Sequence, residues 1–405
     1  MMSEFNVPAN TVRKPLRLAI VGMGGRSTSF MGYFAKNPSD GRVVALCDQI
    51  PEKARYLADY YGVKADIFEN TREMIERTSP DALFITTSDH AHVQPAEAAL
   101  AANIHVFCEK PMATTIEDCD RIINAAQKSS AIFYLGFNLR HGPIHETVHE
   151  LISNGRIGKT TTIEANEWYY GGKTYFRRWN RLIRFGGGLW ITKACHDFDL
   201  LNWMAGADPQ TVYATASLSH YRPRADAAQQ CRHCKLQFSC PDYYDILNLP
   251  KPHDDLMRGL RLIAEEHGEE PGDLCLFNAE KDTFDNGIAV VTYANDIRAT
   301  YTVNVLTARS TRQMRVVGTE GMIEADMSDG KILVTERHTG RQWHYDMRGL
   351  MASGHGGADD RLVKDFIHTV HTGKKPRTGW AEGKRAIEVA LAAQQSMETG
   401  QVVRF

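Results

Sequence analysis

Short apolar runs alternate with longer stretches of helical character over the first third of this chain. The runs have the length of buried strands, and glycine or polar residues bound them. The predicted strands are Leu16–Gly22, Arg42–Asp48, Asp81–Thr86, Ile104–Phe107 and Ala131–Gly136. The predicted helices between them are Arg26–Lys36, Pro51–Tyr61, Pro95–Ala102 and Thr115–Lys128. This alternation predicts βαβ units and a parallel sheet.

The pattern changes after a predicted helix over Ile144–Asn154. Short β-rich runs with glycine or polar turns follow, which indicates a mostly antiparallel sheet with one face free to pack against a second subunit. These predicted strands are Thr160–Trp168, Thr211–Ser219, Gly287–Tyr293, Arg298–Leu306, Gln313–Gly318, Gly321–Asp326 and Lys331–Arg337. We therefore predict one domain over residues 1–139 and another over 140–405, with an inserted lobe at about 220–285.

Composition narrows the class of protein. The 405 residues are too many for a single core, and 43% of them are hydrophobic. A net charge of −2 gives no broad basic field for nucleic acid or anionic lipid. No apolar run has the length of a membrane span, and the first fifteen residues lack the apolar centre of a secretory signal. With only eight scattered cysteines, we expect a cytoplasmic protein.

A glycine-rich turn, Gly22-Met23-Gly24-Gly25-Arg26-Ser27, joins the first strand to the first helix. It departs from GxGxxG because Ser27 stands at the third glycine position, but the turn still suits a pyrophosphate at a helix N-terminus. Asp48 ends the second strand, where a carboxylate binds ribose hydroxyls and disfavours NADP relative to NAD. The alternatives are an ordinary loop and a capping role for Asp48. The fold class is therefore α/β, with an N-terminal Rossmann domain on a parallel sheet and a C-terminal α+β domain on a mostly antiparallel open sheet.

Cys108-Glu109-Lys110-Pro111 follows directly after the fourth predicted strand. Open parallel sheets bind ligands at the carboxyl ends of their strands, which places Lys110 near the nicotinamide. The alternative is a surface lysine before a proline turn.

The segment HVFCEKPMA, with Thr87-Ser88-Asp89-His90-Ala91-His92 upstream, resembles the glucose–fructose oxidoreductase / inositol dehydrogenase (Gfo/Idh/MocA) family. The resemblance implies that Lys110 lies beside substrate and nicotinamide, and that His92 is the family's histidine after the third strand. Asp89 stands where an asparagine is usual. The cofactor residues expected from the turn and the resemblance are Gly22, Gly24, Gly25, Arg26, Ser27, Asp48, Thr87, Ser88, His92, Glu109, Lys110 and Asn138.

A second stretch, from Gly186 to Asp199, carries three glycines and then a helical pattern that places Thr192, His196 and Asp199 on one face. The family usually has a glycine run, an aspartate, a histidine four residues later and an aspartate three residues after that, so Thr192 is a departure. We interpret His196 as the general base and Lys110 as the group that polarises the substrate oxygen. Lys193 would lower the pKa of His196 or bind a hydroxyl. The alternative for His196 is an ordinary helix histidine.

Three further segments complete the expected substrate site. Arg140 lies in a family-like link between the domains, Tyr169 follows an early strand, and His355 begins the last helical region with Asp359 after it. Packing in the core is the alternative for Tyr169, and a helix cap is the alternative for His355. The expected substrate residues are Lys110, Arg140, Tyr169, Thr192, Lys193, His196, Asp199 and His355.

Four cysteines of the inserted lobe have zinc-like spacing. Cys231 and Cys234 form a CxxC pair, Cys240 follows, and Cys275 comes later. A CxxC turns two thiolates to one point, and two more complete a structural Cys₄ site, as family members with a comparable insertion often show. His233 or His220 is an alternative fourth ligand, and a set of unliganded reduced thiols is the alternative to any metal.

Together these features predict an NAD-dependent oxidoreductase. Its catalytic residues would be Lys110, His196 and Lys193, and hydride would pass between nicotinamide and a secondary alcohol carbon of a sugar, glycoside or inositol. A glycoside-cleaving or epimerising enzyme that recycles tightly bound NAD is the alternative, and a non-catalytic NAD-binding regulator is a third hypothesis. The expected partners are a sugar-like small molecule and further copies of the chain, in a homodimer or homotetramer.

Overall fold

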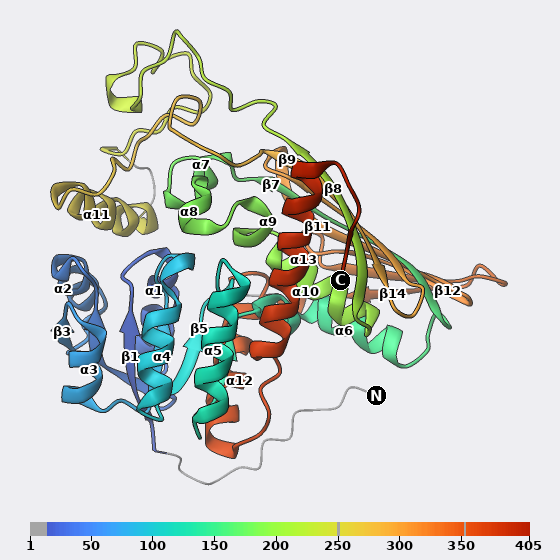
Figure 1. Cartoon of the computed structure of the whole chain (residues 1–405), viewed down its shortest axis with the longest axis horizontal. Coiled ribbons are helices and arrows are strands. Elements are labelled where there is room, and N and C mark those ends of the chain that lie inside the picture. Colours follow the sequence, from blue (N-terminus) through green and yellow to red (C-terminus); the bar gives the residue numbers. More distant parts are fainter. Residues whose placement is uncertain (1–13, 249–251, 352–353) are drawn as a thin grey trace.

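The N-terminal domain is a parallel sheet covered by helices. The structure is a computed structural model that describes residues 14–248, 252–351 and 354–405. Six parallel strands are arranged in the order β3-β2-β1-β4-β5-β6, which is the doubly wound Rossmann order (Figure 1). Their bounds are β1 (Leu16–Val21), β2 (Gly41–Cys47), β3 (Asp66–Phe68), β4 (Ala82–Ile85), β5 (His105–Cys108) and β6 (Phe133–Leu135). The predicted parallel Rossmann sheet is confirmed.

The helices of this domain begin where local chemistry favours it. Pro51 occupies the first turn of its helix, and the side chains of Asn70 and Thr115 accept hydrogen bonds from the first backbone N–H groups of two others. The helices are α1 (Gly25–Lys36), α2 (Pro51–Tyr61), α3 (Thr71–Thr78), α4 (Val93–Ala101) and α5 (Ile116–Lys128). β3 and α3 were not among the predicted elements.

The second domain contains a nine-stranded sheet in the order β14-β13-β12-β11-β7-β10-β9-β8-β15. Its pairs are antiparallel except for β7 with β10. The strands are β7 (Thr160–Tyr170), β8 (Pro209–Ser217), β9 (Asn286–Tyr293), β10 (Arg298–Asn304), β11 (Leu306–Gly318), β12 (Gly321–Asp326), β13 (Lys331–Glu336), β14 (Gln342–Asp346) and β15 (Val403–Arg404). The predicted mostly antiparallel sheet is confirmed.

One face of this sheet is covered by helices and the other is open. Tyr293 and Tyr301 point to the covered face and donate hydrogen bonds to side chains of a helix, whereas Ile288 and Val290 are exposed on the opposite face. The helices before β8 are α6 (Pro143–Ser153), α7 (Gly172–Tyr175), α8 (Ile183–Gly186), α9 (Leu189–Thr192) and α10 (Cys195–Ala205). A second subunit on the open face remains a prediction.

The last two helices return to the first domain. Leu362 and Phe366 of α12 (Ala358–Thr372) are fully buried in one cluster with Phe84, Phe107 and Tyr134 of the parallel sheet. α13 (Trp380–Thr399) lies against both α5 and β8, between the two sheets (Figure 1). Two helices from the part of the chain after residue 139 therefore pack against the domain formed before it.

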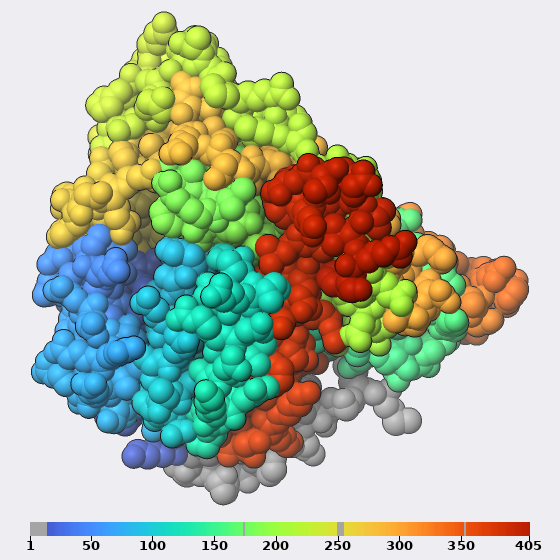
Figure 2. All heavy atoms as spheres, in the orientation of Figure 1, coloured from blue at the N-terminus to red at the C-terminus, as the bar shows by residue number. Residues whose placement is uncertain are grey.

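Between β8 and β9 the chain forms the inserted lobe, which stands out from the molecule (Figure 2). It contains the short 3₁₀ turn Cys231–His233 and the helix α11 (Pro252–Glu266). α11 packs on α2 of the first domain (Figure 1). Within the three described ranges, no helix combines the length and the apolar character that crossing a membrane requires.

Candidate active site

The glycine-rich turn between β1 and α1 has the geometry of a phosphate cradle. Gly22 has a φ of +89°, and a Cβ on it would lie 2.6 Å from the backbone nitrogen of Thr87, so only glycine fits there. A Cβ on Gly24 would meet nothing within 4 Å, so the space above the turn is open. α1 begins at Gly25, and its first N–H groups therefore face that space.

Neighbouring side chains hold this turn in place. The Ser27 hydroxyl donates to the carbonyl of Gly24 at 2.7 Å. The Asp48 carboxylate accepts from the backbone N–H groups of Met23 at 2.6 Å and Ile50 at 2.9 Å, and the Lys53 ammonium lies 3.4 Å away. Asp48 thus caps the chain before α2 and also touches the turn, so its two proposed roles are compatible.

Lys110 joins the two domains. Its ammonium donates to the carbonyl of Thr192 in the second domain at 2.8 Å, across 82 residues of chain, and a cis peptide bond follows it. Its neighbour Glu109 pairs with Arg26 of α1 at 2.7 Å. Lys110 therefore occupies the junction of the domains at the carboxyl end of β5, and the alternative of a surface lysine does not describe it.

His196 lies at the start of α10, on the other side of the same junction. Its imidazole is buried, and within the described part of the chain its Nδ1 atom has no hydrogen-bond partner. Burial lowers its pKa well below the ordinary value, and the positive charge of Lys110 is the largest of the charges that lower it further. An imidazole that is neutral at pH 7 can accept a proton.

The prediction of one continuous helix after the glycine run is wrong. The chain forms two short helices, α9 and α10, which are separated at Lys193 and Ala194. The carbonyl of Leu189 accepts hydrogen bonds from both of these residues, so an extra residue enters the turn and breaks the regular spacing. The backbone carbonyl of Thr192, rather than its position on a shared helical face, is what brings it to Lys110.

A buried carboxyl group that was not among the expected site residues lies here as well. Asp89 lies in the loop after β4, and no described residue provides a hydrogen-bond partner for its Oδ2 atom. Burial raises its pKa to about 7, against the opposing effects of Lys110 and of a hydrogen bond with Thr192. Its place after a β-strand of the parallel sheet was the available signal in the sequence.

Unsatisfied polar atoms gather at this junction. The buried atoms that no described residue pairs with include Oγ1 of Thr87, Oδ2 of Asp89, Oδ1 of Asn138 and Nδ1 of His196. Each such group costs about 1–3 kcal/mol when nothing pairs with it, and in native proteins such groups usually have partners. Together with the open space over Gly24, these atoms fit a polar ligand such as a dinucleotide and its substrate.

Two of the expected substrate residues pair with each other. Arg140 makes a bidentate contact with Asp199 at 2.6 and 2.8 Å, and both side chains are buried. Their hydrogen-bonding groups are thus largely engaged within the protein, and their effect on a substrate would be indirect.

Lys193 belongs to a buried network of charges. Its ammonium lies 2.7 Å from Glu167 and 4.1 Å from the centre of the Tyr169 ring. Glu167 also contacts Arg312 at 2.5 Å, and Arg312 contacts Asp197 at 2.7 Å. The two carboxylates and two cations of this network, all in the second domain, neutralise one another's charge. Lys193 and Arg312 both contribute to the low pKa of His196, as we expected for Lys193.

The N-terminus of α12 completes the junction. His355 Nδ1 lies 2.9 Å from Asp359, and that carboxylate also accepts from Asn138 at 2.7 Å and from Arg26 at 3.2 Å. These contacts hold the pKa of Asp359 well below its ordinary value. His355 is one of the charges that lower the pKa of His196, so the structure brings these two predicted residues together.

Two expected cofactor residues face other protein groups. The buried His92 ring contacts the carbonyl oxygens of Pro111 at 2.8 Å and Thr87 at 3.3 Å, which ties the loop after β5 to the loop after β4. The Ser88 hydroxyl lies 3.2 Å from the ring of His90.

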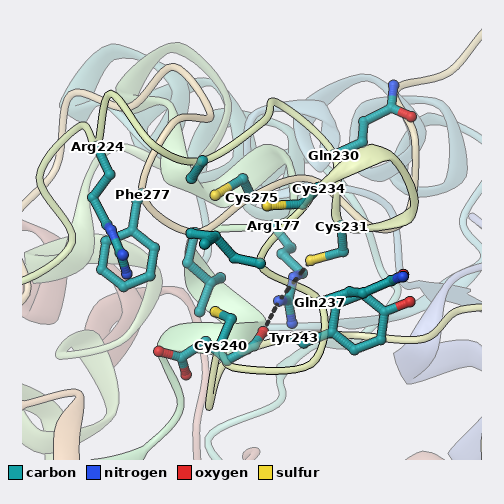
Figure 3. Close-up of a pocket in the computed structure, with 14 residues that line it drawn as sticks. Arg177, Arg224, Gln230, Cys231, Cys234, Gln237, Cys240, Tyr243, Cys275 and Phe277 are labelled. Carbon is teal, nitrogen blue, oxygen red and sulfur yellow. Dashed lines mark hydrogen bonds between the residues drawn. The ribbon is translucent and has the colours of Figure 1, made fainter.

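The predicted zinc site is not supported. Cys231, Cys234, Cys240 and Cys275 do line one small cavity of about 20 Å³, but Figure 3 shows their sulfur atoms spread around it. Among the described residues, no group of three or more His, Cys, Asp or Glu side chains is arranged to hold a metal ion. The buried guanidinium of Arg177 contacts the Cys231 sulfur at 3.6 Å, so a cation already lies among the thiols.

Comparison with known proteins agrees with this architecture. Residues 16–137 match the oxidoreductase family with an NAD-binding Rossmann fold, and residues 149–405 match the C-terminal alpha/beta domain of that family. YteT of Bacillus subtilis (strain 168), a protein named as an oxidoreductase, is 32% identical over 71% of this chain and 68% of its own length.

Two further relatives match over nearly the whole chain. Myo-inositol 2-dehydrogenase of Thermotoga maritima is 23% identical over 96% of this chain and 98% of its own length. Levoglucosan dehydrogenase, solved with NADH and levoglucosan, shares the fold with a TM-score of 0.75 at 17% identity, over 96% of this chain and 99% of that one. Alignments with several other curated relatives span 52–56% of their length.

The Rossmann domain, the second sheet domain and these matches define a dehydrogenase-type oxidoreductase with an NAD-binding domain. The chain belongs to the Gfo/Idh/MocA family, as the sequence motifs indicated.

Proposed function

We propose that this enzyme transfers hydride between NAD and a secondary alcohol carbon of a sugar-like polyol. The observation that carries the proposal is the meeting of Lys110 with the Thr192–His196 segment. The Lys110 ammonium donates to the Thr192 carbonyl at 2.8 Å, and its charge acts on the buried imidazole of His196, whose Nδ1 finds no hydrogen-bond partner among the described residues. A neutral base can take the proton of an alcohol, and a cation can stabilise the negative charge that develops on its oxygen.

Each side chain at the junction has a separate role in the proposed reaction. Bound NAD supplies a nicotinamide ring that accepts or returns hydride. His196 accepts the hydroxyl proton of the substrate, because its lowered pKa keeps it unprotonated at pH 7. Lys110 donates a hydrogen bond to the same substrate oxygen and stabilises negative charge on it. Glu109 holds Arg26 at the start of α1, so the turn that would bind the pyrophosphate stays aligned with Lys110.

A polyol suits the polar groups that remain available. Asp89 and Asn138 each offer a buried oxygen that has no partner in the described ranges, and such oxygens can accept hydrogen bonds from hydroxyl groups. The Lys193 ammonium, held by Glu167, lies on the second-domain side. The names of two relatives, myo-inositol 2-dehydrogenase and levoglucosan dehydrogenase, support a substrate of this class.

A spectrophotometric screen tests the proposal. Purified protein is incubated with sugars, glycosides and inositols, with NAD and NADP in parallel, and absorbance of the reduced cofactor is followed. We expect NADH to accumulate with at least one polyol, and more slowly with NADP because Asp48 would repel a 2′-phosphate. Release of product from a glycoside without net NADH would favour the cleaving enzyme instead.

The pH dependence of turnover tests the role of His196. Because its pKa is well below 6.5, the base is unprotonated above that pKa, and activity is lost only as the pH falls through it. We expect kcat for alcohol oxidation to fall only at pH values well below 6.5. His196→Gln should lower kcat roughly 100- to 10,000-fold and remove this dependence.

Asp89 requires a control in this experiment, because its pKa of about 7 could produce an inflection of its own. The profile is therefore measured in Asp89→Asn as well. An inflection at or above pH 6.5 that persists in Asp89→Asn and disappears in His196→Gln would contradict the lowered pKa of His196.

A further inference from the structure

The helix α11 of the inserted lobe lies over the glycine-rich turn of the first domain. The terminal methyl group of Met257 is 3.5 Å from the position that a Cβ on Gly25 would occupy. Arg178, from the segment after α7, places its Nη2 atom 4.0 Å from the same position. Two segments from outside the Rossmann domain therefore meet at the first residue of α1, beside the open space over Gly24.

α11 is anchored to the Rossmann domain by apolar contacts. Leu256 and Leu260 are buried in one cluster with Leu57 of α2. Gly259 allows the close approach, because a Cβ on it would lie 2.3 Å from the hydroxyl oxygen of Tyr56. The lobe thus packs against α2, the helix that follows Asp48 in the chain.

Ion pairs reinforce this anchor at the end of the helix. Lys53 of α2 lies 3.4 Å from Asp48 and 3.4 Å from Glu269 of the lobe, so it links the predicted ribose-binding carboxylate to the segment that follows α11. His267 lies 3.2 Å from Glu52. These pairs are partly exposed, and we expect them to guide the lobe into position rather than to dominate its attachment.

The charge of Arg178 has no direct ion-pair partner among the described residues. Its guanidinium is half-buried, and the carboxyl group whose charge acts on it is that of Asp89. Burial and the nearby positive charge of Arg261 on α11 lower its pKa, which means that the two cations lie close enough to repel. Positive charge beside a helix N-terminus fits an anion such as a pyrophosphate.

We propose that α11 and Arg178 cover the pyrophosphate of bound NAD, so that release of the reduced cofactor is slow and limits the steady-state rate. This inference rests on the proposed function. Arg178 would bind the phosphate oxygens from the side opposite the glycine turn, and Met257 would cover the turn. Since α11 is held by Leu256 and Leu260, release of NAD requires those leucines to leave their buried positions.

Cofactor retention gives a direct test, independent of activity. Holoprotein is passed through gel filtration, denatured by heat, and the released dinucleotide is quantified. The release rate is then measured by loading the protein with NADH, adding excess NAD and following NADH fluorescence. We expect close to one dinucleotide per chain, and an NADH release rate close to the kcat of polyol oxidation.

Variants test whether Arg178 and α11 are the parts of the protein that slow NADH release. Arg178→Gln and the double variant Leu256→Ala/Leu260→Ala should each release NADH at least ~10-fold faster, because one loses the phosphate contact and the other loosens the helix. The matched controls are Arg184→Gln, an exposed arginine near Arg178 in sequence, and Arg258→Gln on α11. Both controls should release NADH at the wild-type rate. If the leucine variant does not fold, Arg178→Gln alone decides, since its side chain does not belong to the apolar core.

The outcomes separate this inference from the proposed function. A wild-type protein that turns over a polyol but releases NADH faster than it turns over, with no change in Arg178→Gln, overturns the inference and leaves the proposed function standing. A protein that binds neither NAD nor NADP overturns both.

Discussion

Lys110→Met is expected to lower kcat by about 100- to 1,000-fold, which is the usual effect of removing one charged donor from a developing oxyanion. Methionine preserves the length and apolar stem of the side chain but removes the ammonium that reaches the Thr192 carbonyl. Steady-state rates are measured with the polyol identified by the screen. Bound dinucleotide is quantified in the same preparation, and we expect its amount to change little, because the glycine turn is untouched.

The matched control is Lys128→Met, which removes an exposed lysine at the end of α5. Its kcat should equal that of the wild type. A Lys110→Met variant that binds NAD and keeps its rate would contradict the assignment. The positive charge of Lys110 lowers the pKa of His196, so that pKa should rise in Lys110→Met. The remaining activity should then be lost at a higher pH than in the wild type.

Arg312→Met is expected to reduce the stability of the second domain by about 3–5 kcal/mol, the usual effect of leaving a buried charge unpaired. The Arg312 side chain is 8% exposed and contacts Glu167 at 2.5 Å and Asp197 at 2.7 Å. Without it, Glu167 keeps its contact with Lys193, whereas buried Asp197 is left without an ion-pair partner among the described residues. Thermal unfolding followed by circular dichroism should show a fall in Tm of roughly 5–10 °C.

Arg315→Met provides the control, since Arg315 is on the same strand but is 49% exposed and pairs with Glu324 on the surface. Its removal should change stability by less than about 1 kcal/mol. The double variant Arg312→Met/Asp197→Asn should recover part of the loss, because the stranded charge is removed. Equal Tm values for Arg312→Met and Arg315→Met would mean that the buried network is not what stabilises this region.

Much of the Rossmann domain could be predicted from the sequence. Its buried strands are apolar almost throughout, so β1, β2, β4 and β5 stand out between glycine and proline residues. β3 was missed because three residues at the sheet edge, Asp66–Phe68, give no usable pattern. α3 was missed because its eight residues carry few apolar side chains.

The sequence points to the proposed catalytic pair, but not to the residues that pack around it. Lys110 and His196 carry local motifs, so they could be recognised without knowledge of the fold. Glu167 and Arg312 come together only because β7 pairs with β11 in a register that sets them opposite each other. Arg178 depends on packing between domains, which no local pattern records. The cysteine spacing satisfied a zinc pattern, whereas the fold of the lobe spreads the thiols around a cavity.

The return of α12 to the parallel sheet limits how this enzyme can be re-engineered. Phe84 and Phe107 both pack edge-on against Phe366, which lies 282 and 259 positions later in the chain. A chimera that takes its cofactor half from a relative as the block 16–137 would therefore set a foreign aromatic surface against the native helix. To exchange the nucleotide preference by domain grafting, residues 16–137 and residues 358–372 would both have to come from the same relative.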